Sequence, residues 1–356
     1  MLFEEPILQW LLQNGGFMDS QVFILNEKRN VTLTAYLQDD SQEFWRAKKR
    51  PAVVIFPGGA YAYCSDREAD PVAQENLRAG YHAFVLRYSV GWENAVWPNP
   101  LEDYDQAMEL IAAHAKEWHL IPEKIAVIGF SAGGHLAACA ATMAKHRPAA
   151  AILAYPVILE GLAAICAKGA PGADKAVDSQ TCPCFIAATG TDTTVSAMNS
   201  LRFVEALYEN GISAELHLYA FGPHGFSTAR TSIADPAELC SRTLHWVEDS
   251  ISWLEDVFGA FTSGEMSSPR CPGRVRKDKD PYLSVDCLLA TIAENQIAVE
   301  RLNQLILVEE TTQKWIAEQK ENLLTSEMTL RSALQFLNVP GEVIRKADEI
   351  LSEIPN

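Results

Sequence analysis

Strand-like and helix-like runs alternate from residue 51 to residue 258, and this alternation constrains the fold more than any other feature. Short apolar runs that predict buried strands lie at 51–59, 82–90, 125–130, 149–157, 184–190 and 214–221. Runs that predict helices lie at 71–79, 101–118, 132–144, 197–210 and 236–258. Residues 22–38 add two strands around a polar turn. This order predicts an α/β fold, with a mostly parallel sheet covered by helices on both faces.

The composition changes after this region. Residues 261–281 are rich in Ser, Pro, Gly and charged residues and lack periodicity, which predicts a linker between a domain at 1–260 and a helical region at 282–356. Val285, Ile292, Val299 and Ile306 recur at heptad spacing. This stripe needs a partner surface, either a second copy in a homodimer, with Asn295 fixing the register, or the segments 327–338 and 341–354 of the same chain.

The motif Gly129-Phe130-Ser131-Ala132-Gly133 directly follows the strand-like run IAVI and precedes a helix-like run. Glycines on both sides of a serine relieve crowding in a sharp strand-to-helix turn and expose the hydroxyl above the sheet edge. Ser131 is therefore the predicted nucleophile. The Ala132 amide, at the start of the helix, is a predicted donor to a developing oxyanion.

A serine nucleophile needs a base, and the base needs an acid that orients it. Asp192 follows the strand-like run at 184–190, and His224 follows the run at 214–221, so both are expected at strand ends in the chain order Ser, Asp, His. The alternatives, which sit in less suitable places, are Asp174, Asp178, His135, His217 and His245.

A second amide donor is expected from the loop Pro57-Gly58-Gly59-Ala60, after the run at 51–59. Tyr61, Trp92 and Trp97 lie in loops expected near the strand ends. Aromatic side chains there could stack on a sugar or an aryl acid, or they could simply cover the core. Arg67 and Glu68 are interpreted as a structural ion pair.

Residues 51–228 resemble the α/β-hydrolase esterases related to hormone-sensitive lipase, and especially the bacterial acetylxylan and feruloyl esterases. The resemblance rests on FPGGAYAYCSDREADPVA (56–73), GFSAGGHLAA (129–138) and the segment from GTDTTV to GPHGF (190–226). It implies a Ser131–Asp192–His224 triad and an oxyanion hole at Gly59, Ala60 and Ala132. Pro57 departs from the family's HGGG form, and the region after residue 281 is not part of the family pattern.

Charge and composition limit the remaining possibilities. The net charge of −17 disfavours nucleic acid and anionic lipid as partners. The first residues lack a basic segment, no apolar run is long enough for a membrane span, and the 8 cysteines are scattered, so we expect a cytoplasmic protein with reduced thiols. No metal ion or organic cofactor is expected, because the triad chemistry requires none.

The favoured hypothesis is a serine carboxylic-ester hydrolase that acts on short acyl esters, including acetylated xylo-oligosaccharides. A serine peptidase of the prolyl-oligopeptidase type is one alternative. The other is a hydrolase-fold scaffold without catalysis, in which the helical tail binds a partner.

Overall fold

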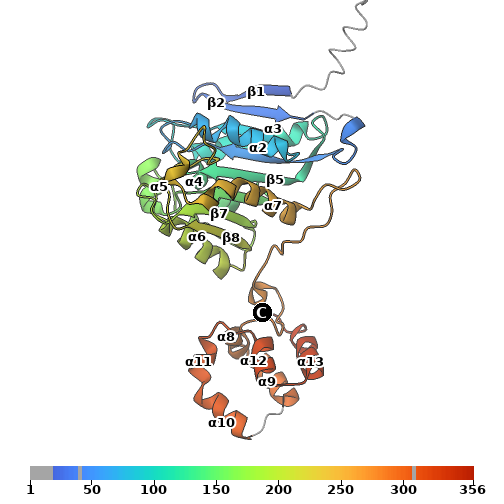
Figure 1. Cartoon of the computed structure of the whole chain (residues 1–356). Helices are drawn as coiled ribbons and strands as arrows, with labels where there is room; N and C mark the ends of the chain where they lie inside the picture. Colours follow the sequence, from blue (N-terminus) through green and yellow to red (C-terminus); the bar gives the residue numbers. More distant parts are fainter. Residues whose placement is uncertain (1–18, 39–41, 307–309) are drawn as a thin grey trace, which may run out of the picture. The chain divides into compact units, whose positions relative to one another are not determined.

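The computed structural model describes residues 19–38, 42–306 and 310–356, and the strands among them form one eight-stranded sheet (Figure 1). Their order across the sheet is β1-β2-β4-β3-β5-β6-β7-β8. β2 pairs antiparallel with β1 and β4, and the remaining pairs are parallel, so the predicted mostly parallel sheet is confirmed. The strands are Asp19–Asn26 (β1), Val31–Leu37 (β2), Arg50–Phe56 (β3), His82–Arg87 (β4), Leu120–Phe130 (β5), Ala150–Ala154 (β6), Cys184–Thr189 (β7) and Ala214–Tyr219 (β8).

The burial of the strands follows their sequence patterns. Every residue of the apolar strand β3 is buried, because helices cover the sheet on both faces there. In β2 buried and partly exposed residues alternate, as expected for a strand with one face towards the core. In the edge strand β1, Val22 and Ile24 are exposed. The core therefore lies around the central parallel strands.

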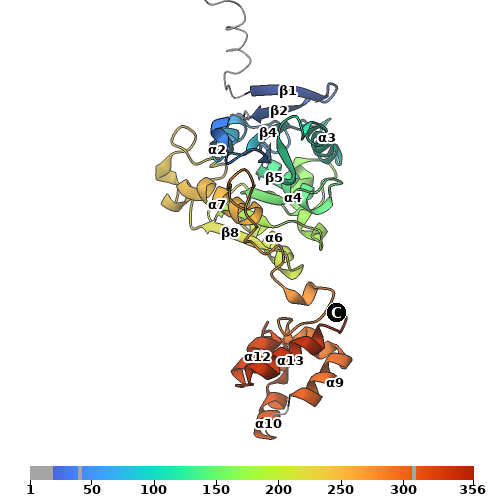
Figure 2. The same cartoon turned by 90° about the vertical axis from the view of Figure 1, so that its right-hand side faces the viewer.

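Helices cover both faces of the sheet (Figure 2). α2 and α7 pack on one face, where Val72, Leu77, Trp246 and Trp253 join the side chains of the central strands. α3, α4 and α6 lie on the other side (Figure 2). The helices of this part are Asp70–Arg78 (α2), Asn99–His114 (α3), Ala132–Met143 (α4), Glu160–Cys166 (α5), Met198–Glu209 (α6) and Trp246–Phe258 (α7).

The predicted helix at 236–258 begins later than expected, at Trp246. Residues Pro236–Glu238 and Ser241–His245 form two short 3₁₀ turns instead. Leu239 and Cys240 between them have extended backbone angles and are buried. Their burial against the sheet requires an extended chain at this point, which interrupts the helix that the sequence suggests.

The described chain divides into two compact units. The sheet unit runs to Leu207 and continues over Ser213–Gly273, and the helical unit comprises Tyr208–Ile212 and Arg274–Asn356. Within the stretch predicted as a linker, Phe261 pairs with Met266, and the Arg276 guanidinium donates two hydrogen bonds to Asp278. The boundaries expected from the sequence stay predictions.

The helical unit has a core of its own. Its helices are Leu289–Glu294 (α8), Gln296–Leu305 (α9), Glu310–Glu318 (α10), Lys320–Leu324 (α11), Leu330–Phe336 (α12) and Gly341–Leu351 (α13). The heptad stripe does not lie on one helix, because Val285 precedes the first helix of the unit and Asn295 separates α8 from α9. The Asn295 side chain accepts a hydrogen bond from the Ala298 amide and so caps α9.

Part of the stripe packs within the same chain. Val285 and Ile292 are buried in a cluster with residues of α12 and α13, and Ile306 packs against this cluster while partly exposed. The reason given for a homodimer therefore no longer holds for these side chains, and the dimer itself stays a prediction.

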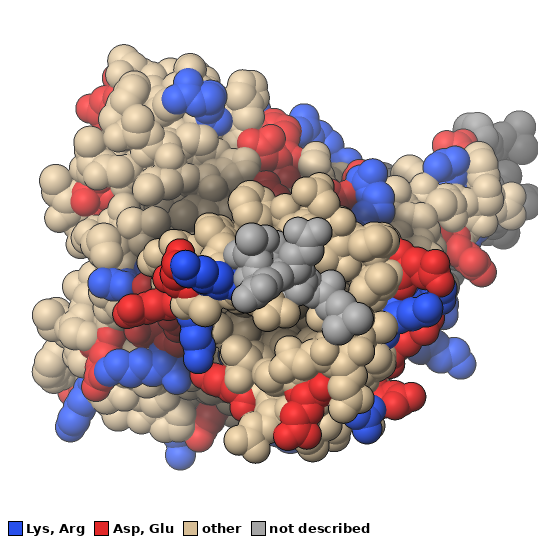
Figure 3. All heavy atoms as spheres, turned by 90° about the horizontal axis from the view of Figure 1, so that it is seen from below, with Lys and Arg blue, Asp and Glu red and all other residues tan. Residues whose placement is uncertain are grey.

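Two surface properties of the molecule complete this description. Figure 3 shows acidic and basic side chains interspersed over the face in view. Ion pairs of the described residues include Arg331–Asp286 and Arg345–Glu349. Among the described residues, no helix has the length and apolar character needed to cross a membrane.

Candidate active site

Ser131 lies in the sharp turn between β5 and α4, and the backbone there has a φ of 52°. A positive φ is strained for a residue with a side chain, and such strain concentrates at functional sites. A Cβ on Gly133 would lie 2.1 Å from the carbonyl oxygen of Phe56, and one on Gly129 would lie 2.2 Å from the carbonyl oxygen of Gly133. Both glycines are therefore required by the close approach of β3, β5 and α4 around the serine.

The structure brings Ser131, His224 and Asp192 together at the carboxyl ends of the parallel strands. The Oγ atom of Ser131 lies 2.9 Å from Nε2 of His224, and Nδ1 of His224 lies 2.6 Å from Oδ2 of Asp192. The three residues follow β5, β8 and β7 respectively. This geometry suits proton transfer from the serine hydroxyl to the imidazole.

Asp192 is buried, and its two oxygens have different partners. Oδ2 faces His224, whereas Oδ1 accepts hydrogen bonds from the backbone amides of Thr194 (2.8 Å) and Val195 (2.9 Å). Burial raises the pKa of Asp192, but the hydrogen bonds from His224 and the two amides outweigh it, so the pKa lies below its ordinary value. The site thus holds a carboxylate that accepts a hydrogen bond from Nδ1–H of the imidazole.

Three backbone amides near Ser131 have no hydrogen-bond acceptor within the described residues, namely those of Gly59, Ala60 and Ala132. Gly59 has a φ of 123°, and a Cβ there would lie 2.2 Å from the carbonyl oxygen of Tyr63, so only glycine fits. Unpaired amides in a glycine-rich loop and at a helix N-terminus can donate to an oxyanion.

The three aromatic residues expected near the site have different surroundings. Tyr61 is 1% exposed, and its hydroxyl forms a 2.8 Å hydrogen bond with Nδ1 of His135. The Trp97 ring packs edge-on against His135, with 5.5 Å between ring centroids. Trp92 is 82% exposed. The exposed indole of Trp92 is thus the most accessible of the three to a ligand.

The alternative acids and bases lie in other environments. Asp178 forms an ion pair with Arg147, and Nε2 of His217 is hydrogen-bonded to Glu215 at 2.8 Å. His135 is buried on α4, and burial lowers its pKa to about 4. Asp174 lies in the 3₁₀ turn Ala173–Ala176, and His245 is exposed at the end of the turn Ser241–His245. Within the described residues, none of these side chains is hydrogen-bonded to Oγ of Ser131, whose side-chain partner is Nε2 of His224.

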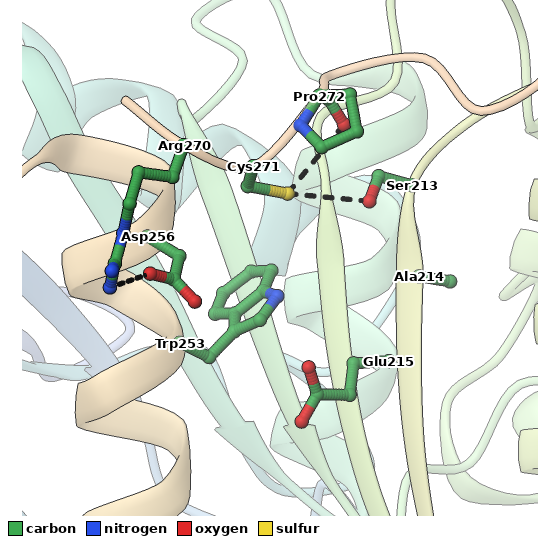
Figure 4. Close-up of a pocket in the computed structure, with 8 residues that line it drawn as sticks. All are labelled: Ser213, Ala214, Glu215, Trp253, Asp256, Arg270, Cys271 and Pro272. Atoms are coloured by element: carbon green, nitrogen blue, oxygen red, sulfur yellow. Dashed lines mark hydrogen bonds and ion pairs between the residues drawn. The ribbon is translucent and has the colours of Figure 1, made fainter. Parts of the chain in front are cut away.

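A polar pocket of about 430 Å³ opens at the amino end of β8, the opposite end of the strand from His224 (Figure 4). Figure 4 shows Arg270 directed towards Asp256 of α7, with which it forms an ion pair, and Cys271 beside Ser213. Four of the polar side chains of this pocket thus pair with one another, and Glu215 is hydrogen-bonded to His217. Within the described ranges, no group of three or more His, Cys, Asp and Glu side chains is arranged to hold a metal ion.

Sequence reasoning missed the surroundings of Glu68. Its Oε1 atom lies 4.0 Å from Nε of Arg67, beyond hydrogen-bonding distance, so the expected ion pair is weak at most. The Glu68 carboxylate instead accepts hydrogen bonds from the Tyr155 hydroxyl and the Gly58 amide. A buried glutamate within a charged SDREAD segment carries no local signal of such distant partners.

A sheet with this strand order, and a serine, an aspartate and a histidine at its strand ends, define the class of α/β-hydrolases. The chain belongs to the α/β-hydrolase family. It is 42% identical to MGS-M1, an α/β-hydrolase enzyme from a Medee basin deep-sea metagenome library, over 68% of this chain and 98% of that one, with a TM-score of 0.63.

Two further comparisons concern enzymes of plant polysaccharides. The chain is 31% identical to endo-1,4-β-xylanase B of Butyrivibrio fibrisolvens, over 64% of this chain and 38% of that protein. It is 29% identical to an acetylxylan esterase of Xylanibacter ruminicola, over 49% of this chain and 41% of that protein. The chain thus spans about two fifths of the length of these relatives. The family model BD-FAE matches residues 43–157.

Proposed function

We propose that the sheet unit is a serine carboxylesterase that hydrolyses short acyl esters. The observation that carries the proposal is the hydrogen-bonded chain from Oγ of Ser131 through His224 to Asp192, with lengths of 2.9 and 2.6 Å. In this mechanism Ser131 attacks the ester carbonyl while Nε2 of His224 takes the hydroxyl proton.

The amides of Gly59, Ala60 and Ala132 then donate to the oxyanion of the tetrahedral intermediate. The protonated imidazole gives its proton to the leaving alcohol, and an acyl-enzyme on Ser131 remains. His224 next removes a proton from a water molecule, which attacks the acyl group and releases the acid. Asp192 keeps the imidazole oriented and stabilises its charged form throughout.

The substrate class is the second part of the proposal. We infer acetylated xylo-oligosaccharides, on the support of the similarity to an acetylxylan esterase and to a xylanase. The segment between β6 and β7 contains only the short helix α5 and one 3₁₀ turn, which favours a small acyl group. A cavity of about 500 Å³, whose lining includes Arg67 and Thr228, lies beside the segment after His224 and offers room for a hydroxyl-rich alcohol. The cytoplasmic location stays a prediction from the sequence.

Hydrolysis of p-nitrophenyl acetate by the wild type and by Ser131→Ala tests the reaction. We expect the variant to lose roughly 10³-fold or more in kcat, since triad residues act as a unit, while Ser241→Ala, at an exposed serine, keeps full activity. More than a tenth of wild-type activity in Ser131→Ala would contradict the assignment.

A series of p-nitrophenyl esters from acetate to octanoate, together with acetylated xylo- and manno-oligosaccharides, tests the substrate. We expect kcat/KM to be highest for acetyl groups. A steady rise from acetate to octanoate would overturn the short-acyl proposal, and cleavage of a peptide anilide in preference to esters would favour the peptidase alternative.

A further inference from the structure

A carboxylate that the mechanism above does not use lies buried beneath the candidate active site. The Glu68 side chain is 3% exposed. Its Oε2 atom accepts a 2.8 Å hydrogen bond from the Gly58 amide, and its Oε1 atom accepts a 2.7 Å hydrogen bond from the Tyr155 hydroxyl. A buried carboxylate is costly unless its oxygens are hydrogen-bonded, so these two contacts are what retain it there.

The first contact reaches the loop that carries the candidate oxyanion donors. Gly58 immediately precedes Gly59 and Ala60, and a Cβ on Gly58 would lie 2.6 Å from Oε2 of Glu68 and 3.1 Å from Cβ of Ser131. The bond from the Gly58 amide to Glu68 thus fixes the loop directly against the nucleophile. The amides of Gly59 and Ala60, next along the chain, have no acceptor in the part of the chain that the structure describes.

The second contact reaches the base. The Tyr155 ring packs edge-on against the imidazole of His224, with 4.9 Å between ring centroids. Its hydroxyl donates to Glu68 and accepts a 3.0 Å hydrogen bond from the Ser227 amide, three residues after His224. Tyr155 therefore forms one wall of the imidazole site and also holds the segment that follows it.

The arrangement of donors requires two acceptor oxygens, which a carboxylate offers and an amide does not. The Gly58 amide can only donate, and the Tyr155 hydroxyl, which accepts from Ser227, needs an acceptor for its own proton. A carboxylate accepts at both oxygens and satisfies both partners. A glutamine in this place has one oxygen and one NH₂ group, so one of the two bonds is lost in either orientation.

We propose that Glu68 is a positioning residue that couples the oxyanion-donor loop to the His224 segment, through Gly58 on one side and Tyr155 on the other. This inference rests on the proposed esterase function. Glu68 does not touch the reacting atoms. It sets the orientation of groups that stabilise charge in the transition state, so its loss lowers kcat more than it changes KM.

Glu68→Gln tests the proposal on p-nitrophenyl acetate. We expect kcat to fall roughly 10- to 100-fold, less than the loss on removing an oxyanion donor outright, while KM changes little. The inhibition constant of a short-chain trifluoromethyl ketone, which adds to the serine and places an oxyanion among the amides, should rise in parallel with the loss in kcat/KM.

Asp103→Asn is the matched control. Asp103 is also a fully buried carboxylate that accepts from a backbone amide, that of Ser89 at 2.8 Å, and it pairs with Arg29 rather than with the triad. Asp103→Asn is expected to lower the Tm at least as much as Glu68→Gln and to leave kcat and the inhibition constant near their wild-type values. If both variants lose kcat in proportion to their loss of stability, Glu68 is merely structural.

Tyr155→Phe provides a second variant, which keeps the ring on His224 and removes only the hydroxyl. We expect kcat to fall with an unchanged KM, and the double variant with Glu68→Gln to lose less than the product of the single losses, because both variants break the same chain of contacts from Gly58 through Glu68 to Tyr155. If Glu68→Gln does not fold, the kcat of Tyr155→Phe decides alone.

Wild-type kcat in folded Glu68→Gln or in Tyr155→Phe would overturn the proposal. An inactive wild type, or activity that persists in Ser131→Ala, would instead overturn the proposed function.

Discussion

Replacement of Asp192 by asparagine tests the candidate triad in a way that the structure makes unusually specific. Oδ1 of Asp192 accepts from the amides of Thr194 and Val195, so the carbonyl oxygen of an asparagine is held at that position. The NH₂ group of the asparagine then takes the place of Oδ2 and donates towards Nδ1 of His224. The imidazole must carry its proton on Nε2 and presents a donor, not a base, to Ser131.

The expected magnitude follows from the loss of the correct tautomer. We expect kcat for p-nitrophenyl acetate near pH 8 to fall roughly 10³- to 10⁴-fold, which corresponds to about 4–5.5 kcal/mol in the activation free energy. The fold should be retained, because the two backbone amides keep their acceptor, and the Tm should change little.

Asp178→Asn is the control, since Asp178 was the alternative acid and pairs with Arg147. It should keep wild-type kcat. Asp192→Asn that retains more than about a tenth of wild-type kcat would refute the tautomer argument, and a loss confined to Asp178→Asn would transfer the role of the acid to that residue.

Three further expectations concern stability and the helical unit. Gly133→Ala should destabilise the protein by about 3 kcal/mol or more in urea titrations, because its Cβ would meet the Phe56 carbonyl. The control Gly161→Ala, in open space on α5, should be neutral or slightly stabilising. Equal stability of the two variants would contradict this packing. Burial lowers the pKa of His135 from 6.5 to about 4. Between these two values the unfolded chain binds a proton that the folded chain does not, so the free energy of unfolding decreases as the pH is lowered from 6.5 towards 4. The difference in unfolding free energy between pH 7 and pH 5 should therefore be about 2 kcal/mol smaller in His135→Gln, and an unchanged pH dependence would be inconsistent with a neutral buried imidazole. A chain that ends at Gly273 should keep wild-type kcat/KM, since the triad and the three amides belong to the sheet unit. Light scattering of the full-length and the shortened chain tests the predicted dimer, which is wrong if both are monomeric.

The sequence by itself determined the backbone architecture of the sheet unit. Runs such as 51–59 are apolar and bounded by glycine or proline, and they become buried parallel strands because local pattern and strand propensity agree there. The spacing of Gly129, Ser131 and Gly133 identified the turn, since only glycine permits the approach of neighbouring backbones. Asp192 and His224 could be selected because residues that follow parallel strands meet at one sheet edge.

Tertiary structure alone decided which distant side chains meet. Glu68 is hydrogen-bonded to Gly58 and Tyr155, whereas its sequence neighbour Arg67 lies 4.0 Å away. Tyr61 is buried against His135. Val285, which lies in an apparent heptad, is buried before the first helix of its unit. The spacing of residues within a segment determines the conformation of that segment. These contacts instead join residues from different segments, and a short stretch of sequence contains only one of the two residues in each contact.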